Sequence, residues 1–274
     1  MPVGTDDFAR EAWRSYLTTG KPPKGVRQPW FENPRFRPFF RVLPRDPRCQ
    51  LCYIPFKGVG GVLARHVLGV TPSPLNPRLC NACERFAEKF LGGVEMEASV
   101  LFADIRGSTA LAEQLGPAEF SNLVHRFYGA AVKPLIAQNA LIQNFMGDGL
   151  ISFFVPAFSG PNHAKAAIEA GRGILHATGN KKGQTPWILV GVGVNTGEAY
   201  IGSVRVDDGR TDIPVLGDTV NTAARLCSEA AGGELFVSKR AGSVSGLAFD
   251  QYELRQIMLK GKQDSVEAWV VENK

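Results

Sequence analysis

Short apolar runs alternate with amphipathic stretches from Glu97 to the last residue of this 274-residue chain. Short apolar runs bounded by turn residues are typical of buried strands, whereas apolar positions three and four residues apart are typical of helices. Phe120, Leu123, Val124 and Phe127, for example, fall on one helical stripe. This order predicts an α+β sandwich, in which one mixed sheet carries helices packed on a single face.

The same periodicities place the individual elements. Gly147-Asp148-Gly149 separates two apolar runs and is typical of a hairpin turn. We also expect a strand pair that turns at Thr196–Gly197, and a helix with Asp218 as its N-cap. The expected strands cover residues 98–105, 141–146, 150–155, 187–197, 198–206 and 234–238, followed by a terminal hairpin over 249–271. The expected helices cover residues 117–138, 162–178 and 218–231.

The front of the chain has a different composition. Seven prolines between Pro22 and Pro47 disfavour long helices and sheet interiors. We therefore expect an extended arm over residues 1–48, with one short helix near Asp6–Leu17. The following segment, residues 49–95, combines four clustered cysteines with a Gly-rich turn and a helix. The turn contains Gly58, Gly60 and Gly61, and the helix runs from about Asn81 to Phe90. The rest of the chain, residues 96–274, forms a third part.

Charge is spread unevenly over these parts. Residues 1–95 carry 15 Lys/Arg against 8 Asp/Glu, whereas residues 96–274 carry 16 against 18. Nucleic acid, an acidic partner or a membrane surface could each use the basic front, and scattered surface charge is the simpler alternative. No apolar run approaches the roughly 20 residues that cross a bilayer, and the polar opening differs from a signal peptide. We therefore expect a cytoplasmic protein with no membrane span, whose cysteines are free thiols or metal ligands.

Two acidic residues lie where apolar strands end. Asp104 closes a buried strand, and Asp148 lies in the hairpin turn. Two carboxylates on adjacent strands can hold one or two Mg²⁺ ions for phosphate chemistry. A helix is expected to start soon after Asp104, and the unpaired N–H groups at a helix start suit a polyphosphate.

A second group of polar residues lies in the segment GDTVNTAARL. Asn221 and Arg225 are four residues apart and therefore share one face of the expected helix. An amide and a guanidinium on one face could bind a ribose and a developing charge on phosphorus. Lys260, in the turn of the last hairpin, is either a phosphate ligand or a solvated turn lysine.

Four of these motifs together carry a resemblance. FADIRGST, NFMGDG, VLGDTVNTAARL and LKGK, in this order, resemble the catalytic domain of class III nucleotidyl cyclases, over roughly Glu97 to Asn273. The resemblance implies a ferredoxin-like α/β sandwich with a largely antiparallel sheet. It implies an enzyme that converts a nucleoside triphosphate into a 3′,5′-cyclic nucleotide and pyrophosphate. It also implies a head-to-tail homodimer whose sites combine residues of both chains.

The resemblance further implies a role for each matching residue. Asp104 and Asp148 would hold two Mg²⁺ or Mn²⁺ ions, with the Ile105 carbonyl as a further ligand. Asn221 and Arg225 would orient the ribose and stabilise the transition-state α-phosphate. The terminal phosphates would be bound by the Lys260 side chain and by backbone N–H groups of Gly107, Ser108 and Thr109.

The residues expected to select the base depart from the family pattern. Where purine-selective members usually carry a Lys, this chain has Asn144, and the usual partner position is Pro214. A proline side chain has no donor, whereas an asparagine can both donate and accept. ATP is the expected substrate, and GTP or a pyrimidine triphosphate is the alternative. A binding-only protein, which holds a nucleotide without converting it, is the rival from another class.

The four clustered cysteines form two pairs, Cys49-x2-Cys52 and Cys80-x2-Cys83. Paired CxxC motifs at such a spacing predict a metal site, with structural Zn²⁺ ahead of an Fe–S cluster and free thiols. This module would either report metal or redox state to the cyclase or, with the basic arm, dock nucleic acid or an acidic protein. We favour regulation, because a catalytic output needs an input.

Overall fold

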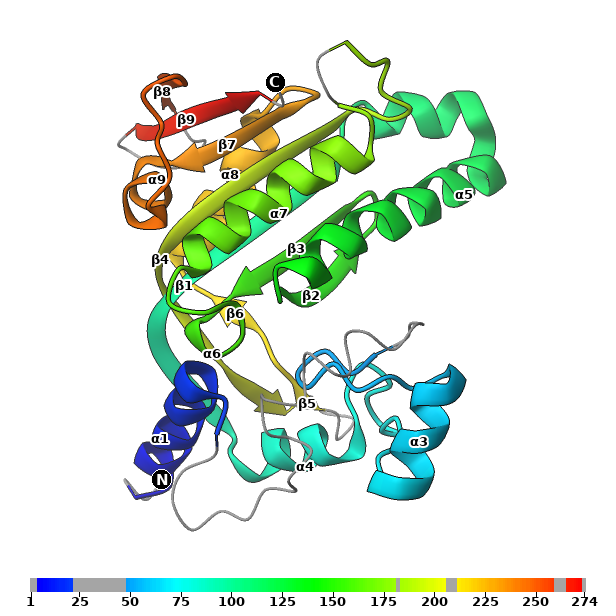
Figure 1. The fold of residues 1–274 in the computed structure, drawn as a ribbon, viewed down its shortest axis with the longest axis vertical. Coiled ribbons are helices and arrows are strands. Elements are labelled where there is room, and N and C mark those ends of the chain that lie inside the picture. Colours follow the sequence, from blue (N-terminus) through cyan, green and yellow to red (C-terminus); the bar gives the residue numbers. More distant parts are fainter. Residues whose placement is uncertain (1–3, 22–47, 181–182, 206–210, 259–264, 273–274) are drawn as a thin grey trace. The chain divides into compact units, whose positions relative to one another are not determined.

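The computed structural model describes residues 4–21, 48–180, 183–205, 211–258 and 265–272 (Figure 1). These residues form two compact units. The cysteine unit comprises Met1–Met96, Pro156–Phe158 and Tyr200–Leu216. The sheet unit comprises Glu97–Val155, Ser159–Ala199 and Gly217–Lys274. Residues 22–47 of the expected arm over residues 1–48 lie outside the described residues, as does the turn that contains Lys260.

Nine strands of the described chain form one sheet, in the order β2-β3-β1-β4-β7-β9-β8, with β5 and β6 paired to β4. Its hairpins and the β1–β3 pair are antiparallel, whereas β4 and β7 run parallel. This mixed, mostly antiparallel sheet confirms the expected fold class. The strands are β1 (Gly92–Ile105), β2 (Leu141–Met146), β3 (Gly149–Phe154), β4 (Val190–Arg205), β5 (Thr211–Asp212), β6 (Val215–Leu216), β7 (Glu234–Ser238), β8 (Glu253–Ile257) and β9 (Val266–Glu272).

Helices cover both faces of the sheet, which differs in one detail from the single covered face expected. Leu235 and Val237 of β7 point into a core shared with α5, α7 and α9, whereas Phe236 packs with Leu226 of α8 on the opposite face. Successive strand residues point to opposite faces, so one apolar strand can serve both cores. Figure 1 shows α7 in front of the sheet and α8 behind it. The helices are α5 (Ser108–Ala137), α6 (Pro156–Ser159), α7 (His163–Ala177), α8 (Asp218–Glu229) and α9 (Lys239–Ser245).

The expected turn at Thr196–Gly197 is wrong, because β4 continues without interruption from Val190 to Arg205. The glycines of this strand serve a close approach instead. A Cβ at Gly193 would lie 2.2 Å from the backbone nitrogen of Cys227 and 2.5 Å from the Ala223 carbonyl oxygen. Glycine in a strand often marks such an approach of a second backbone. Here it allows α8 to lie directly on β4.

The N-cap of α8 is Gly217 rather than the expected Asp218, which is the first helical residue. Helix α5 begins at Ser108, in line with the helix start expected soon after Asp104. It is interrupted at Gly116, whose φ is 74°, and then continues as the helix expected from residue 117. The expected helical stripe therefore forms only the second half of a longer, kinked helix.

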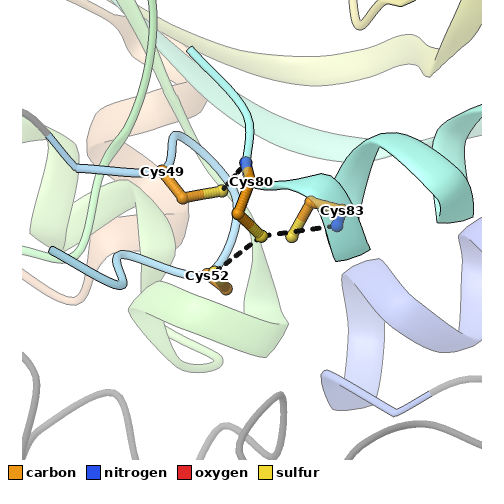
Figure 2. Close-up of side chains that lie close together, drawn as sticks. All are labelled: Cys49, Cys52, Cys80 and Cys83. Atoms are coloured by element: carbon orange, nitrogen blue, oxygen red, sulfur yellow. Dashed lines mark hydrogen bonds between the residues drawn. The ribbon is translucent and has the colours of Figure 1, made fainter. Parts of the chain in front are cut away.

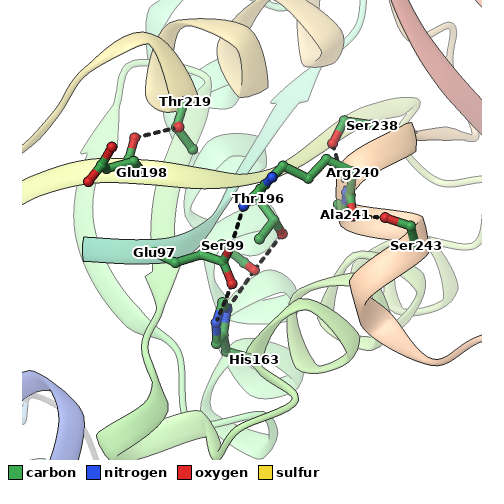
Figure 3. A network of polar contacts seen from close by, with 10 residues as sticks. All are labelled: Glu97, Ser99, His163, Thr196, Glu198, Thr219, Ser238, Arg240, Ala241 and Ser243. Atoms are coloured by element: carbon green, nitrogen blue, oxygen red, sulfur yellow. Dashed lines mark hydrogen bonds and ion pairs between the residues drawn. The ribbon is translucent and has the colours of Figure 1, made fainter. Parts of the chain in front are cut away.

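A polar network lies beside the sheet-unit core (Figure 3). His163 on α7 is buried, and its Nδ1 lies 2.8 Å from the Ser99 hydroxyl of β1. That hydroxyl is also 2.7 Å from the Thr196 hydroxyl of β4. The other ring nitrogen of His163 lies 3.8 Å from Glu97, which is paired with Arg240 at 2.5 Å. The network therefore joins two central strands to α7 and α9 by polar contacts.

The cysteine unit is held partly by aromatic packing. Helix α1 (Gly4–Thr19) matches the short helix expected, and its Trp13 donates a 2.7 Å hydrogen bond to the Phe90 carbonyl. The Phe86 ring lies 5.2 Å from that of Trp13 and 5.0 Å from that of Tyr16. Phe86 belongs to α4 (Asn81–Lys89), a helix that the sequence also predicts.

The expected Gly-rich turn at residues 58–61 is a helix instead. Helix α3 runs from Gly58 to Leu68 and ends at Gly69 in the left-handed conformation. Gly61 is needed for packing, because a Cβ there would lie 2.5 Å from the Phe56 carbonyl carbon. No helix within the described part of the chain is both long and apolar enough to span a bilayer.

Candidate functional site

The candidate metal-binding residues of the sheet unit lie together at the end of β1. Asp104 pairs with Gly149 in the β1–β3 register, directly beside the turn that carries Asp148. The Ile105 N–H donates a 3.1 Å hydrogen bond to the Asp148 carbonyl. A Cβ at Gly149 would lie 2.8 Å from Oδ1 of Asp104, so glycine leaves room for this carboxylate. The structure therefore brings Asp104, Ile105 and Asp148 into one small site.

Arg106 is a member of this site that the sequence analysis did not single out. Its guanidinium lies 2.5 Å from the Asp104 carboxylate. It also donates to the Ser228 carbonyl at 3.2 Å, and its backbone N–H donates to the Leu189 carbonyl at 2.8 Å. The only signal in the sequence is an arginine two residues after the acid that ends a strand. Two further partners of Arg106, Ser228 and Leu189, are distant in sequence, so the pattern could not reveal how this arginine is held.

Burial and charge both act on the carboxylates. Burial raises the pKa of Asp104, the Arg106 guanidinium opposes this rise, and the nearby Asp148 adds to it. Tyr128 on α5 donates a 2.5 Å hydrogen bond to the Gly147 carbonyl. Burial, followed by the charges of Asp148 and Asp104, raises the pKa of its phenol. Positive charge nearby stabilises two close carboxylates in their ionised forms. The site therefore favours the binding of a divalent cation.

Helix α5 begins immediately after this site. Gly107 is its N-cap and has a φ of 68°, a left-handed conformation that glycine adopts without strain. Ser108 and Thr109 occupy the first turn, where backbone N–H groups have no acceptor within the helix. These N–H groups can bind an anion next to the acidic pair.

Helix α8 presents Asn221 and Arg225 away from the sheet. Thr219 fixes the N-terminal end of this helix to β4. Its hydroxyl donates to the Glu198 carbonyl at 2.6 Å (Figure 3), and its backbone carbonyl accepts from the Asn195 side-chain amide at 3.0 Å. Its buried positions include Thr222, Ala223, Leu226 and Cys227. Asn221 is exposed and Arg225 half-buried, and within the described residues neither side chain has a hydrogen bond or ion pair.

The two residues expected to select the base lie on separate segments. Asn144 is half-buried on β2, next to an irregularity in the β2–β3 pairing, and its side chain accepts from the Phe145 N–H at 3.0 Å. Pro214 is half-buried between β5 and β6. The third binding residue, Lys260, lies outside the described residues.

The four cysteines of the cysteine unit form one buried cluster (Figure 2), whose Sγ atoms all lie within 4.8 Å of one another. Cys52 Sγ is 3.7 Å from Cys80 Sγ, far beyond the roughly 2.05 Å of a disulfide, and all four are free thiols. Four thiolates around one tetrahedral ion, each about 2.3 Å from it, lie about 3.8 Å apart. The sulfur positions therefore fit a tetrahedral Cys₄ metal site.

Backbone groups also point at this cluster. The Cys80 N–H donates to Cys49 Sγ at 3.3 Å, and the Cys83 N–H donates to Cys80 Sγ at 3.4 Å. Burial raises the pKa of the Cys49 thiol, but hydrogen bonds from the other three thiols lower it well below its usual range. Chiefly through the hydrogen bond to Cys49, the pKa values of Cys52 and Cys83 are raised.

Comparison with known proteins identifies the sheet unit. The profile of the adenylate and guanylate cyclase catalytic domain matches residues 94–273. The chain belongs to this cyclase family. The matched range contains Asp104, Ile105, Asp148 and all of α8.

Solved structures show the same fold. The guanylyl cyclase Cya2 is 29% identical, with a TM-score of 0.59 over 66% of this chain and 94% of that one. The adenylyl cyclase CyaB from P. aeruginosa is 28% identical, with a TM-score of 0.57 over 67% of this chain and 98% of that one. A guanylyl and an adenylyl cyclase are thus about equally similar to this chain.

Curated relatives include two uncharacterised proteins of Mycobacterium tuberculosis. One is 33% identical over 162 residues, which make up 58% of this chain and 29% of the relative. The other is 34% identical over 137 residues, which make up 50% of this chain and 25% of the relative. The chain therefore spans less than a third of the length of these relatives.

Proposed function

We propose that this cyclase converts ATP into 3′,5′-cyclic AMP and pyrophosphate. In this reaction the ribose 3′-oxygen loses its proton and forms a bond to the α-phosphorus. The bond from the α-phosphorus to the bridging oxygen of the β-phosphate breaks, and pyrophosphate leaves. The observation that carries the proposal is the convergence of Asp104, Ile105 and Asp148 beside the start of α5.

The donor set at this site fits a hard divalent cation. Two carboxylates and one backbone carbonyl offer only oxygen, which Mg²⁺ and Mn²⁺ prefer. When bound, two such ions lower the pKa of the 3′-hydroxyl and neutralise charge on the triphosphate. Asp104 and Asp148 would hold them, and the N–H groups of Gly107, Ser108 and Thr109 would bind phosphate oxygens at the start of α5.

The unpaired side chains of α8 support a shared site in a homodimer. Asn221 and Arg225 point away from the sheet, and within the described residues neither has a hydrogen bond or ion pair. Facing the metal-binding residues of a second copy, Arg225 would stabilise charge on the α-phosphate while Asn221 orients the ribose. Lys260 would bind the terminal phosphates from the same chain as Arg225. A monomer would then lack half of each site.

Selection of the base rests on Asn144, because Pro214 has no side-chain donor. The asparagine amide can bind adenine, and it can equally serve guanine or a pyrimidine. We therefore propose testing purified protein separately with ATP, GTP, CTP and UTP in the presence of Mn²⁺, with products identified by mass spectrometry. A cyclic product from ATP supports the proposal, one from another triphosphate corrects the base, and none from any would favour the binding-only protein.

Two variants test the site and its sharing between chains. Asp104→Ala should lower turnover by about a thousandfold or more, because a metal ligand is lost. Asp250→Ala, which removes an exposed acid elsewhere in the sheet unit, is the control. Arg225→Ala alone should also be inactive. Random mixing of the two inactive variants should restore about a quarter of wild-type activity, because half of the dimers are mixed and each contains one intact site. No recovery on mixing would contradict the shared site.

We assign the regulatory role to the four-cysteine module, residues 49–95. Its buried sulfur cluster fits Zn²⁺ or an Fe–S cluster, and α4, which starts at this cluster, leads within three residues into β1 and thus toward Asp104. Elemental analysis distinguishes zinc from iron, and the visible absorption of an Fe–S cluster gives an independent reading. Cyclase activity that is the same with and without the bound metal would contradict regulation by the module.

A further inference from the structure

Helix α3 turns its small residues inward and its large apolar residues outward. The buried positions are Gly60, Gly61 and Ala64. The large apolar side chains are exposed: Val59 by 83%, Val62 by 59%, Leu63 by 39% and Val67 by 65%. We call these four residues the α3 stripe.

A surface helix normally buries its large apolar side chains and exposes its polar ones. Helix α3 shows the opposite pattern. It is a regular helix whose C-terminal end is capped, because the Gly69 N–H donates to the Ala64 carbonyl. The small inner residues allow α3 to lie against the Phe56 backbone and leave no room to bury larger ones. A contiguous exposed apolar face of this kind indicates an interaction surface.

Positive charge borders the α3 stripe. Lys57 is the N-cap of α3, and Arg65 lies in its last turn. Both are exposed, and Arg65 follows Val62 by three residues, which makes these two side chains neighbours on the helix. The chain from residue 48 to residue 83 contains four Lys/Arg and no Asp or Glu. The partner surface should therefore be apolar at its centre and anionic at its border.

Three kinds of partner can be compared on this basis. A second copy of α3 would bring Lys57 and Arg65 against the same cations without an acid to pair them, which is unfavourable. Single-stranded nucleic acid binds by stacking its bases on aromatic rings, and the α3 stripe is wholly aliphatic. A bilayer with anionic lipids offers both an apolar layer and a border of phosphates.

We propose that α3 docks on the surface of an anionic lipid bilayer. The α3 stripe enters the boundary between headgroups and acyl chains, while Lys57 and Arg65 face the lipid phosphates. Helix α3 lies along the surface and does not cross the bilayer, since 11 residues of helix span only about 16 Å. This docking is independent of the nucleotide that the sheet unit converts.

Vesicle co-sedimentation of the full chain tests the proposal. Vesicles of phosphatidylcholine with phosphatidylglycerol should bind the protein, and vesicles of phosphatidylcholine alone should bind it much more weakly. The double variant Val62→Gln/Val67→Gln should weaken binding by about tenfold, because two apolar side chains no longer enter the bilayer. Arg65→Gln should weaken it by about fivefold and reduce its salt dependence.

Matched controls lie on the sheet unit. Val244→Gln removes an apolar side chain that is 43% exposed on α9, and Lys165→Gln removes an exposed cation on α7. Both should bind vesicles like the wild type. Circular dichroism and metal content establish that the α3 variants remain folded, and glutamine is a good helix former.

Equal binding to both kinds of vesicle, or no binding to either, would overturn the proposal. The same holds if folded Val62→Gln/Val67→Gln binds like the wild type. Light scattering adds a further test, because a loss of dimer in this variant without vesicles would identify a second copy as the occupant.

Discussion

The two units of this protein are stabilised in different ways. The sheet unit has an extensive aliphatic core in which β1, β3, β4 and β7 pack against α5 and α7. The cysteine unit combines a buried cluster of four thiols with buried apolar side chains, among them Trp13, Leu17, Ile54, Leu79 and Phe90, and it leaves the α3 stripe exposed. A metal ion held by four thiolates would add a cross-link that apolar packing alone does not supply. The comparison predicts that metal supports one unit and packing the other.

The largest expected effect comes from the cysteine cluster. Cys80 caps α4, and its sulfur lies 3.7 Å from that of Cys52. Cys80→Ser keeps a capping group but removes a thiolate ligand, so metal should be lost and the cysteine unit destabilised by several kcal/mol, on the order seen for structural Zn²⁺. Limited proteolysis should then cut within residues 48–90 while the sheet unit stays protected.

Cys227→Ser provides the control for that experiment. Cys227 is buried on α8, outside the cluster, so its substitution should leave metal content unchanged. Equal protease sensitivity of the cysteine unit in Cys80→Ser and the wild type would contradict its dependence on metal.

The next effect tests packing in the sheet unit. Gly193→Ala places a Cβ within 2.5 Å of the α8 backbone, so α8 must move away from β4. We expect a loss of about 3 kcal/mol or more in the free energy of unfolding, because backbone cannot yield as a side chain can. Gly129→Ala is the control, since nothing lies within 4 Å of its Cβ position on α5. Chemical denaturation of both variants measures the difference, and similar midpoints would show that α8 is not packed closely on β4.

These glycines also explain where sequence analysis failed. The predictions were a turn at Thr196–Gly197 and a turn at residues 58–61, yet Gly197 lies in a continuous strand and Gly61 in a helix. Glycine serves turns and close backbone approaches equally well, and only the partner, α8 or the Phe56 backbone, decides between them. Helix α8 is distant in sequence from the first glycine, and Phe56 lies in an irregular segment before the second. Neither contact can therefore be recognised from the local sequence.

Other features could be predicted because their signals are local. The GDG turn between two apolar runs predicted the β2–β3 hairpin and placed Asp148 beside Asp104. The spacing of the CxxC pairs predicted a cluster that the structure contains. Arg106 escaped prediction because its ion pair depends on how the chain turns after β1, and the outward direction of Arg225 depends on the side of the sheet that α8 covers.

A smaller effect is expected from the ion pair at the end of β1. Burial raises the pKa of Asp104, and Arg106 counteracts the rise. Arg106→Gln should therefore raise this pKa further, so that the carboxylate proposed to bind metal becomes protonated at a higher pH. We expect roughly severalfold lower cyclase activity on the acid side of the pH profile and a smaller change near its optimum. Arg240→Gln removes another Arg–carboxylate pair of 2.5 Å and serves as the control. If cyclase activity falls at the same acidic pH in Arg106→Gln as in the wild type, the role of this ion pair is contradicted.

The smallest effect concerns His163 and the stability of the sheet unit. Burial lowers the pKa of His163 below its ordinary value of 6.5, and Glu97 only partly opposes this. Below pH 6.5 the unfolded chain therefore binds a proton that the folded chain resists, and stability falls as the pH decreases toward the folded-state pKa. One proton limits this loss to about 1.4 kcal/mol per pH unit.

His163→Gln can retain a hydrogen bond to Ser99, and it should flatten this fall in stability between pH 6.5 and more acidic conditions. His125→Gln, an exposed position on α5, should leave the fall unchanged. Denaturant midpoints measured across this range decide the matter, because a slope that persists in His163→Gln would assign the acid sensitivity to other groups.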